Sequence, residues 1–138
     1  MSRLSWDHVW SSFATTISLR SCDTKLKVGC IIVPVDNTSV LSLGYNGDHK
    51  GGNNLRDSEE CGSSGFIHAE INALIKMDFN NPKRKKMYIT HSPCIMCAKA
   101  IINANIDEVY YINEYIDVRS IELLLDNHIK VNKLKLLT

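Results

Sequence analysis

The sequence predicts an α/β fold in which a five-stranded mixed sheet carries helices on both faces. Helical and strand-like segments alternate along the chain in the order αββαβαβαβ. This alternation favours a mainly parallel sheet, and two successive strands near the N-terminus favour an antiparallel opening hairpin. The length of 138 residues, of which 44% are hydrophobic, fits a single domain over residues 1–138.

The individual elements are expected from apolar periodicity and from breaks at turn residues. A first helix is expected at residues 5–20, where apolar residues recur at steps of three and four. The further elements are strands Lys27–Val33 and Val40–Tyr45, helix Phe66–Met77, strand Met87–Thr90, helix Cys94–Asn105, strand Ile106–Ile112, helix Val118–Asp126 and strand Ile129–Leu136. Residues 44–65 hold six of the seven glycines without any period. They predict a long surface loop, and such loops are usually functional.

Charge and composition indicate which kinds of binding partner the protein is expected to have. The net charge of +1 gives no broad electrostatic field, so a small ligand is favoured and no nucleic-acid partner is expected. The first ten residues include Arg3, Asp7 and His8, and fit neither a signal peptide nor a membrane span. A cytoplasmic protein with no membrane partner is therefore expected. Its five cysteines then favour metal binding or burial over disulfides.

Two short segments at predicted helix starts carry metal-ligand chemistry. They are His68-Ala69-Glu70 and, after Pro93, the run Cys94-Ile95-Met96-Cys97. Three nitrogen and sulfur ligands leave the fourth tetrahedral position of zinc open, which is typical of catalytic sites. Cys94 and Cys97 share one helical face, and the helix N-terminus favours their thiolates. One catalytic Zn²⁺ per chain is therefore predicted on His68, Cys94 and Cys97.

Glu70 is the predicted catalytic residue. It lies two residues from His68, so it is better placed beside the ion than as a fourth ligand. A carboxylate there can accept a proton from the attacking water. H-x-E followed by P-C-x-x-C is typical of zinc deaminases of nucleobases, in which the Glu is the general acid and base. A structural zinc or two buried thiols would suit the C-x-x-C pattern alone, but His68, 26 residues before Cys94, favours the catalytic reading.

At these residues the chain resembles the cytidine deaminase-like superfamily and, within it, the deoxycytidylate (dCMP) deaminases. The resemblance implies a three-layer α/β/α fold and the hydrolysis of dCMP to dUMP and ammonia, a step of pyrimidine nucleotide biosynthesis. Free-nucleoside deaminases usually have Cys at position 68, and tRNA adenosine deaminases usually have Glu at position 92. The short length is similar to compact versions encoded by phages. The matching segments are Arg3–Asp7, Arg20–Cys22, Lys27–Val33, Gly44–Gly47, His68–Leu74, Thr90–Lys99 and Ile101–Asn103.

The resemblance also implies a substrate site. Asn46 would hydrogen-bond the deoxyribose, the backbone at Ala69 would help to fix the pyrimidine, and Tyr115 would pack against the base, with Ser92 nearby. Arg3 is the first candidate to bind the 5′-phosphate, because a guanidinium group can donate two parallel hydrogen bonds to phosphate oxygens. The second choices are Arg20, Lys25 and Lys27. Other readings stay open: Asn46 as a turn residue, Tyr115 as ordinary packing and Arg3 as a solvated terminus.

Many similar enzymes are hexamers that dCTP activates and dTTP inhibits at the loop containing G-Y-N-G. A triphosphate with Mg²⁺ would approach the amides of this loop. The loop departs from the common pattern, in which Pro stands shortly after G-Y-N-G, because this chain has Asp48-His49-Lys50 there. A second, structural zinc on Cys22, His49 and Cys61 lacks the usual spacing and is not expected. The candidate regulatory residues are Gly44, Tyr45, Asn46, Gly47, Gly51, Gly52 and Asn53.

Two other functions stay open. A deaminase of tRNA adenosine or single-stranded cytidine would need a basic groove with stacking aromatic residues, which the near-neutral charge disfavours. The basic run at residues 83–86 is expected to be a solvated connection. A catalytically silent zinc module would bind nucleotides or partner proteins, and the intact Glu70 disfavours it.

Overall fold

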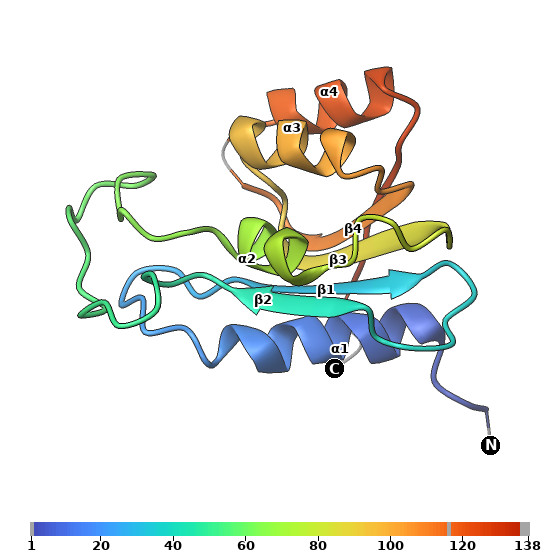
Figure 1. The fold of residues 1–138 in the computed structure, drawn as a ribbon, viewed down its shortest axis with the longest axis horizontal. Helices are drawn as coiled ribbons and strands as arrows, with labels where there is room; N and C mark the ends of the chain where they lie inside the picture. The colour runs from blue at the N-terminus through green and yellow to red at the C-terminus, as the bar shows by residue number, and fades with distance from the viewer. Residues whose placement is uncertain (1, 116, 136–138) are drawn as a thin grey trace.

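The structure is a computed structural model that describes residues 2–115 and 117–135, and it confirms the mixed α/β fold (Figure 1). One five-stranded sheet has the order β2-β1-β3-β4-β5. The strand β1 pairs antiparallel with β2 and with β3, whereas β3, β4 and β5 run parallel. The elements are α1 (Trp6–Ser18), β1 (Gly29–Pro34), β2 (Ser42–Tyr45), α2 (Ala69–Lys76), β3 (Lys85–His91), α3 (Ile95–Asn103), β4 (Glu108–Asn113), α4 (Arg119–Asp126) and β5 (Lys130–Lys133).

The expected mixed sheet is present: β2, β3, β4 and β5 share one direction, whereas two of the four pairings are antiparallel. The reason is the position of β1, which lies between β2 and β3 and opposes both of them. The opening hairpin therefore joins the parallel strands through a second antiparallel pairing. Among the described residues, no helix is both long and apolar enough to cross a membrane.

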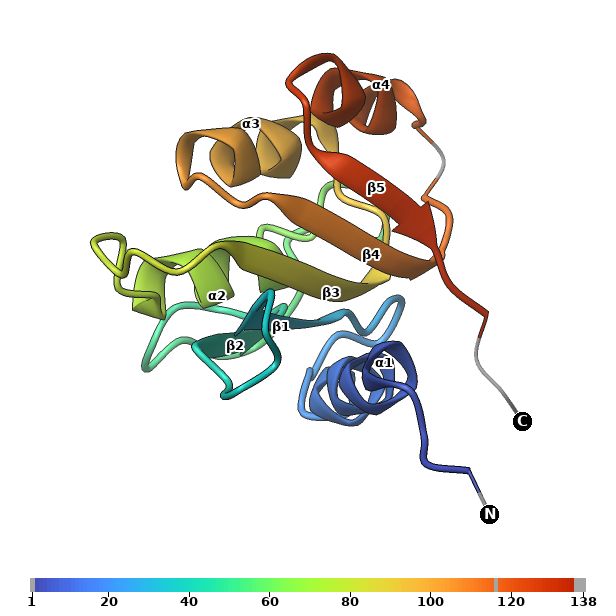
Figure 2. The same cartoon turned by 90° about the vertical axis from the view of Figure 1, so that its right-hand side faces the viewer.

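Helices cover the two faces of the sheet unequally. Helix α1 lies on one face, and α2, α3 and α4 lie on the other (Figures 1 and 2). Successive strand residues point to opposite faces, so Ile31 packs with Trp10 of α1 while Ile32 packs with Ala73 of α2. Both isoleucines are almost fully buried. The three layers predicted from the resemblance are therefore present.

Some element boundaries differ from the expected ones. Helix α2 begins at Ala69 rather than at Phe66, because Ile67 forms an antiparallel bridge with Gly47 and keeps the preceding segment extended. At the other end of the chain, β5 is only four residues long. The last expected strand residue, number 136, lies outside the described residues. The Gly47–Ile67 bridge ties both ends of the long loop to one place.

Helix α1 packs closely on the start of β1. A Cβ atom at Gly29 would lie 2.0 Å from the Ala14 carbonyl oxygen and 2.6 Å from the Ser18 nitrogen. Both of these are backbone atoms of a helix, which cannot move aside as the tip of a side chain could. The contact between α1 and the sheet therefore requires glycine at position 29.

We predict that Gly29→Ala lowers the free energy of unfolding by about 1–3 kcal/mol, the usual cost of overpacking a core. Urea unfolding followed by circular dichroism measures the change. The matched control is Gly47→Ala, because a Cβ at Gly47 would meet no atom within 4 Å. Equal stability of the two variants would contradict the packing argument.

Candidate active site

Three potential metal ligands meet where α2 and α3 begin. His68 is the N-cap residue of α2, Cys94 is the N-cap residue of α3, and Cys97 lies in the first turn of α3. The His68 Nδ1 atom lies 3.3 Å from the Cys97 Sγ atom and 3.5 Å from the Cys94 Sγ atom. All three ligand atoms lie within 4.8 Å of one another. The structure thus brings together the three residues that the sequence predicted as ligands.

The spacing of these atoms fits zinc. Zn–N and Zn–S bonds of about 2.0 and 2.3 Å at tetrahedral angles would separate nitrogen from sulfur by about 3.5 Å. The distances of 3.3 and 3.5 Å lie close to that value. Hydrogen bonding with Cys97, helped by His68, lowers the pKa of Cys94 to about 4 against the opposing effect of burial. A metal would find at least one thiolate ready to bind.

Glu70 lies in the first turn of α2, two residues beyond His68. Its side chain is buried, with 4% of the residue exposed, and burial raises the pKa of its carboxyl above the usual value. A raised pKa makes a carboxyl a better proton carrier near neutral pH. The buried position next to the ligand cluster is the one expected for a general acid and base.

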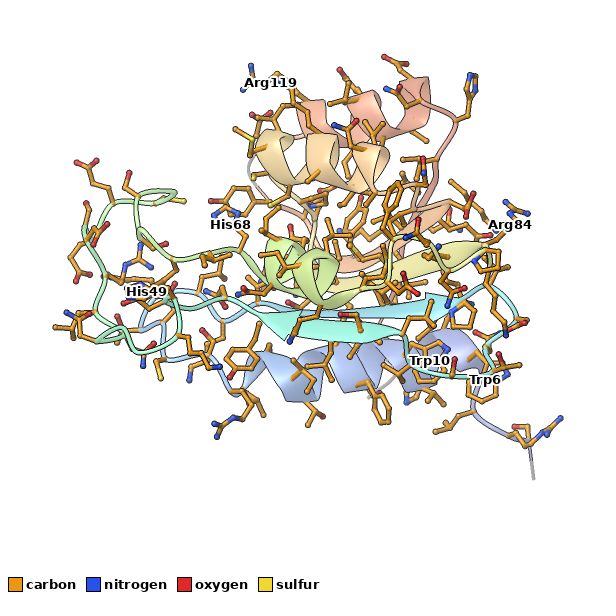
Figure 3. All side chains as sticks on the ribbon, in the orientation of Figure 1. Trp6, Trp10, His49, His68, Arg84 and Arg119 are labelled. Atoms are coloured by element: carbon orange, nitrogen blue, oxygen red, sulfur yellow. The ribbon has the colours of Figure 1, made fainter. Side chains whose placement is uncertain are left out.

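A cavity of about 400 Å³ opens beside the cluster. This volume lies within the range of small-molecule sites. In Figure 3, His68 lies on the side of the molecule from which the loop carrying His49 projects. The cavity is lined by Asp23, Lys25, Leu26, Val28, Asn46, Arg56, Glu59, Cys61, Gly62, Ser64, His68, Ala69, Glu70, His91, Ser92, Cys94, Glu114 and Tyr115.

Four of the five residues expected to bind substrate line this cavity, namely Asn46, Ala69, Ser92 and Tyr115. The Asn46 Oδ1 atom accepts from the Val28 amide at 2.8 Å, and its Nδ2 atom donates to Leu26 O and to Asp23. Both amide hydrogens are thus in use, so a sugar hydroxyl would have to donate to Oδ1.

Ser92 and Tyr115 are joined directly. The Ser92 hydroxyl accepts a hydrogen bond from the Tyr115 amide at 2.7 Å. The Tyr115 hydroxyl lies 3.4 Å from the Cys61 sulfur of the long loop. Ser92 therefore fixes the backbone at Tyr115, and the aromatic ring stands between the end of β4 and the loop.

Arg3, the fifth residue, lies outside the cavity. It is exposed in the segment before α1, and the N-terminal end lies at the opposite side of the molecule from the long loop (Figure 1). The length of α1 separates the two places, so within this chain Arg3 is not placed to hold the phosphate of a nucleotide in the cavity. Of the second choices, Lys25 lines the cavity, whereas Arg20 and Lys27 do not.

The expected regulatory residues are mostly occupied by other contacts. Among the seven, Asn46 alone lines the cavity. Gly44 packs on α2, where a Cβ would lie 2.4 Å from the Ala69 carbonyl oxygen. The Asp48 carboxylate accepts from the amides of His49 and Asn54, which turns part of the loop inward. Close packing therefore accounts for Gly44, and of the amides expected to approach a triphosphate, that of Gly52 donates to the His49 carbonyl oxygen at 2.9 Å within the loop.

Sequence reasoning missed Arg56 and its partner Asp23. Arg56 is the one Lys or Arg between Lys50 and Lys76, and a single cation in a loop rich in Gly, Asn and Ser could have indicated a role for it. Its guanidinium lies 2.6 Å from the Asp23 carboxylate, and both side chains are over nine-tenths buried. Pairing across 33 residues of chain left no local pattern that could have revealed it.

His91 is a second missed residue. It ends β3, lines the cavity and is half-buried, and burial lowers the pKa of its ring. A neutral imidazole is therefore favoured near the ligand cluster. The described residues gather no second group of three His, Cys or acidic side chains, and Cys22, His49 and Cys61 do not come together.

Comparison with known proteins places this geometry in a family. Residues 4–113 match the family described as "Cytidine and deoxycytidylate deaminase zinc-binding region". The chain is 36% identical over 123 residues to ComE operon protein 2 of Bacillus subtilis (strain 168), covering 83% of this chain and 63% of that protein. It is 31% identical over 119 residues to the deoxycytidylate deaminase of Homo sapiens, covering 80% and 66%. The chain thus spans less than two thirds of the length of each of these curated relatives.

A solved structure covers nearly the whole chain. The dCMP deaminase of the cyanophage S-TIM5, in complex with dCMP and dUMP, superposes with a TM-score of 0.84 and 33% sequence identity. The match covers 97% of this chain and 100% of the phage chain. The fold predicted from the resemblance is therefore confirmed over the matched part of the chain.

We predict that Cys97→Ser lowers zinc binding to well below one ion per chain, because a hydroxyl is a poor substitute for thiolate. Metal analysis of the purified variant after dialysis measures the loss. The control is Cys22→Ser, which removes an exposed cysteine outside the cluster. Full zinc content in the Cys97 variant would contradict the assigned ligand set.

Proposed function

The chain belongs to the cytidine and deoxycytidylate deaminase zinc-binding family, and on that premise we propose that it converts dCMP and water into dUMP and ammonia. The observation that carries the proposal is the position of Glu70. This buried carboxyl lines a cavity of about 400 Å³ beside the three ligands, as the deamination of a bound base requires. The cyanophage relative, which binds dCMP and dUMP, supports the same substrate.

Glu70 carries the proton transfers in this proposal. Zinc, when bound by His68, Cys94 and Cys97, supplies Lewis acidity that makes water acidic near neutral pH. Glu70 takes a proton from the water that attacks C4, and it delivers protons to N3 and to the departing amine. A C–O bond forms and a C–N bond breaks, so that one water is consumed and one ammonia is released.

Lys25 is the cation that we assign to the 5′-phosphate. It lines the cavity and pairs with Glu59 at 3.0 Å, with both side chains more than half exposed. Such a pair is worth little in water, so a dianionic phosphate can replace the Glu59 carboxylate. Arg56 is less suited to this task, because its guanidinium is already held by Asp23.

The remaining contacts fix the nucleoside. We assign the Asn46 Oδ1 atom to the deoxyribose and the Tyr115 ring to the face of the base, as the resemblance implies. Asn46 is held rigidly by Val28, Leu26 and Asp23, so it presents one fixed acceptor. Rigid acceptors favour substrates that carry a hydroxyl donor at the matching place.

Regulation by dCTP with Mg²⁺ and by dTTP, in a hexamer, is a separate part of the proposal. It rests on the match at Gly44–Gly47 and on the length of the loop that follows. The Gly52 amide already donates to the His49 carbonyl oxygen, which argues against an open triphosphate site in this conformation. An effector would therefore have to favour a different arrangement of the loop. A cytoplasmic location likewise stays a prediction.

We predict that Glu70→Gln lowers kcat on dCMP by at least about 100-fold, the usual contribution of a general acid and base, while zinc content stays at one ion per chain. Ammonia release from zinc-loaded protein measures kcat, and metal analysis measures zinc. Glu60→Gln is the control, because Glu60 is exposed and its side chain does not line the cavity. A wild-type kcat in Glu70→Gln would contradict the proposed mechanism.

The same assay distinguishes the other functions. Wells with dCTP and Mg²⁺, or with dTTP, test regulation, since a rate indifferent to both effectors would remove it. Single-stranded DNA and tRNA replace dCMP in further wells. Turnover of a polynucleotide but not of dCMP would favour the polynucleotide deaminase, and zinc content without any turnover would favour the silent module.

A further inference from the structure

The long loop is attached to the rest of the chain by one buried side chain. The Arg56 Nη1 atom lies 2.6 and 2.8 Å from the two Asp23 carboxylate oxygens. The same guanidinium donates to its own loop, from Nε to Ser58 O at 2.9 Å and from Nη2 to Glu60 O at 3.1 Å. Arg56 therefore links the loop backbone at two points to a carboxylate that lies before β1.

Few other polar contacts hold this loop. In the described part of the chain, residues 48–65 reach other segments through Arg56–Asp23, the exposed pair Lys25–Glu59 and the contact of Cys61 with Tyr115. The loop otherwise bonds to itself, for example from the Asp57 amide to Ser64 O. It projects from the body of the fold (Figure 1). Arg56 is thus the one polar tether that is shielded from water on both sides.

The tether ends on groups that face the cavity. The Asp23 carboxylate accepts from the Lys25 amide at 2.8 Å and from the Asn46 side chain at 3.2 Å. On the loop side, Arg56 is followed by Glu59, Cys61, Gly62 and Ser64, which line the cavity. Burial opposes the charge of Asp23, yet hydrogen bonds from Lys25 and Arg56 hold the pKa of this carboxyl below its usual value. The pair therefore stays ionised while it joins both walls of the cavity.

We propose that the buried Arg56–Asp23 pair positions the loop wall of the nucleotide cavity, so that Arg56 is a positioning residue for nucleotide binding rather than for the chemical step. This inference rests on the proposed dCMP deaminase function. Without the tether, the loop wall would be ordered only when the nucleotide binds, and this cost would appear in binding. The zinc ligands and Glu70 lie on α2 and α3, so the chemical step would be little affected.

The substitution Arg56→Lys tests the tether with the charge retained. The lysine ammonium group can still pair with Asp23. It cannot reproduce the planar guanidinium group, whose nitrogens bond at once to Asp23 and to the carbonyl oxygens of Ser58 and Glu60. The expected result is a rise of about tenfold in KM for dCMP, with kcat within about threefold of wild type and zinc content unchanged. Arg119→Lys is the matched control, because Arg119 forms a similar pair with Asp117 but is exposed and lies outside the cavity.

The double variant Asp23→Asn/Arg56→Met separates positioning from charge. It removes both charges of the buried pair together, and the side-chain oxygen at position 23 keeps an acceptor for the Lys25 amide, so this protein is expected to fold with a Tm near that of wild type. It lacks the tether, and its KM for dCMP is expected to rise as in Arg56→Lys. A wild-type KM in either folded variant would overturn the proposal, and so would a loss of kcat and zinc with KM unchanged.

Amide hydrogen exchange tests whether Arg56 orders the loop when no substrate is bound. In zinc-loaded protein without nucleotide, the amides of residues 56–64 are expected to exchange faster in Arg56→Lys than in wild type, and the amides of β3 are expected to stay the same. Equal loop exchange in the two proteins would also overturn the proposal. Wild-type protein that fails to deaminate dCMP would instead contradict the proposed function, and the exchange result would still report on the loop.

Discussion

The active site depends on how closely α2 packs against β2. Gly44 lacks a side chain where the Ala69 carbonyl oxygen would lie 2.4 Å from a Cβ, so the first turn of α2 rests directly on the strand. Ser42 donates a hydrogen bond to Ala73 O at 2.6 Å, which fixes the helix along its length. Because His68 is the N-cap residue and Glu70 lies in the first turn, this contact sets the position of the predicted metal ligand and of the proposed catalytic carboxyl together.

The other half of the site depends on the parallel pairing of β3 with β4. Beyond the last residues of β3, the Ser92 amide donates to Asn113 O at 2.9 Å, and the Ser92 hydroxyl accepts from the Tyr115 amide. These bonds hold the end of β4 beside the turn that leads into α3. Cys94 and Tyr115, 21 residues apart in the chain, therefore face one cavity. The carboxyl ends of adjacent parallel strands are the usual place for such convergence.

Hydrogen bonding and charge pairing decide which cavity residues are free to bind a ligand. Arg56 and Lys25 both carry a positive charge into the cavity, but Arg56 is buried against Asp23 and Lys25 is half-exposed against Glu59. The exposed pair costs little to break, whereas breaking the buried pair would leave an unpaired charge away from water. The same difference makes Lys25 suited to a phosphate and Arg56 suited to holding the loop.

The sequence by itself determined the layer architecture and the ligand cluster. Apolar periodicity depends on local backbone geometry, and His68, Cys94 and Cys97 each lie near a helix start, so both could be inferred from spacing. Only the tertiary structure decided that Arg3 lies outside the cavity, that Gly44 serves packing and that Arg56 pairs with Asp23. These outcomes depend on which segments, distant in the sequence, come into contact in the fold. Such contacts produce no periodic pattern of residues along the chain. The antiparallel placement of β1 beside β3 belongs with them, because strand order is set by how both faces of the sheet bury their apolar residues.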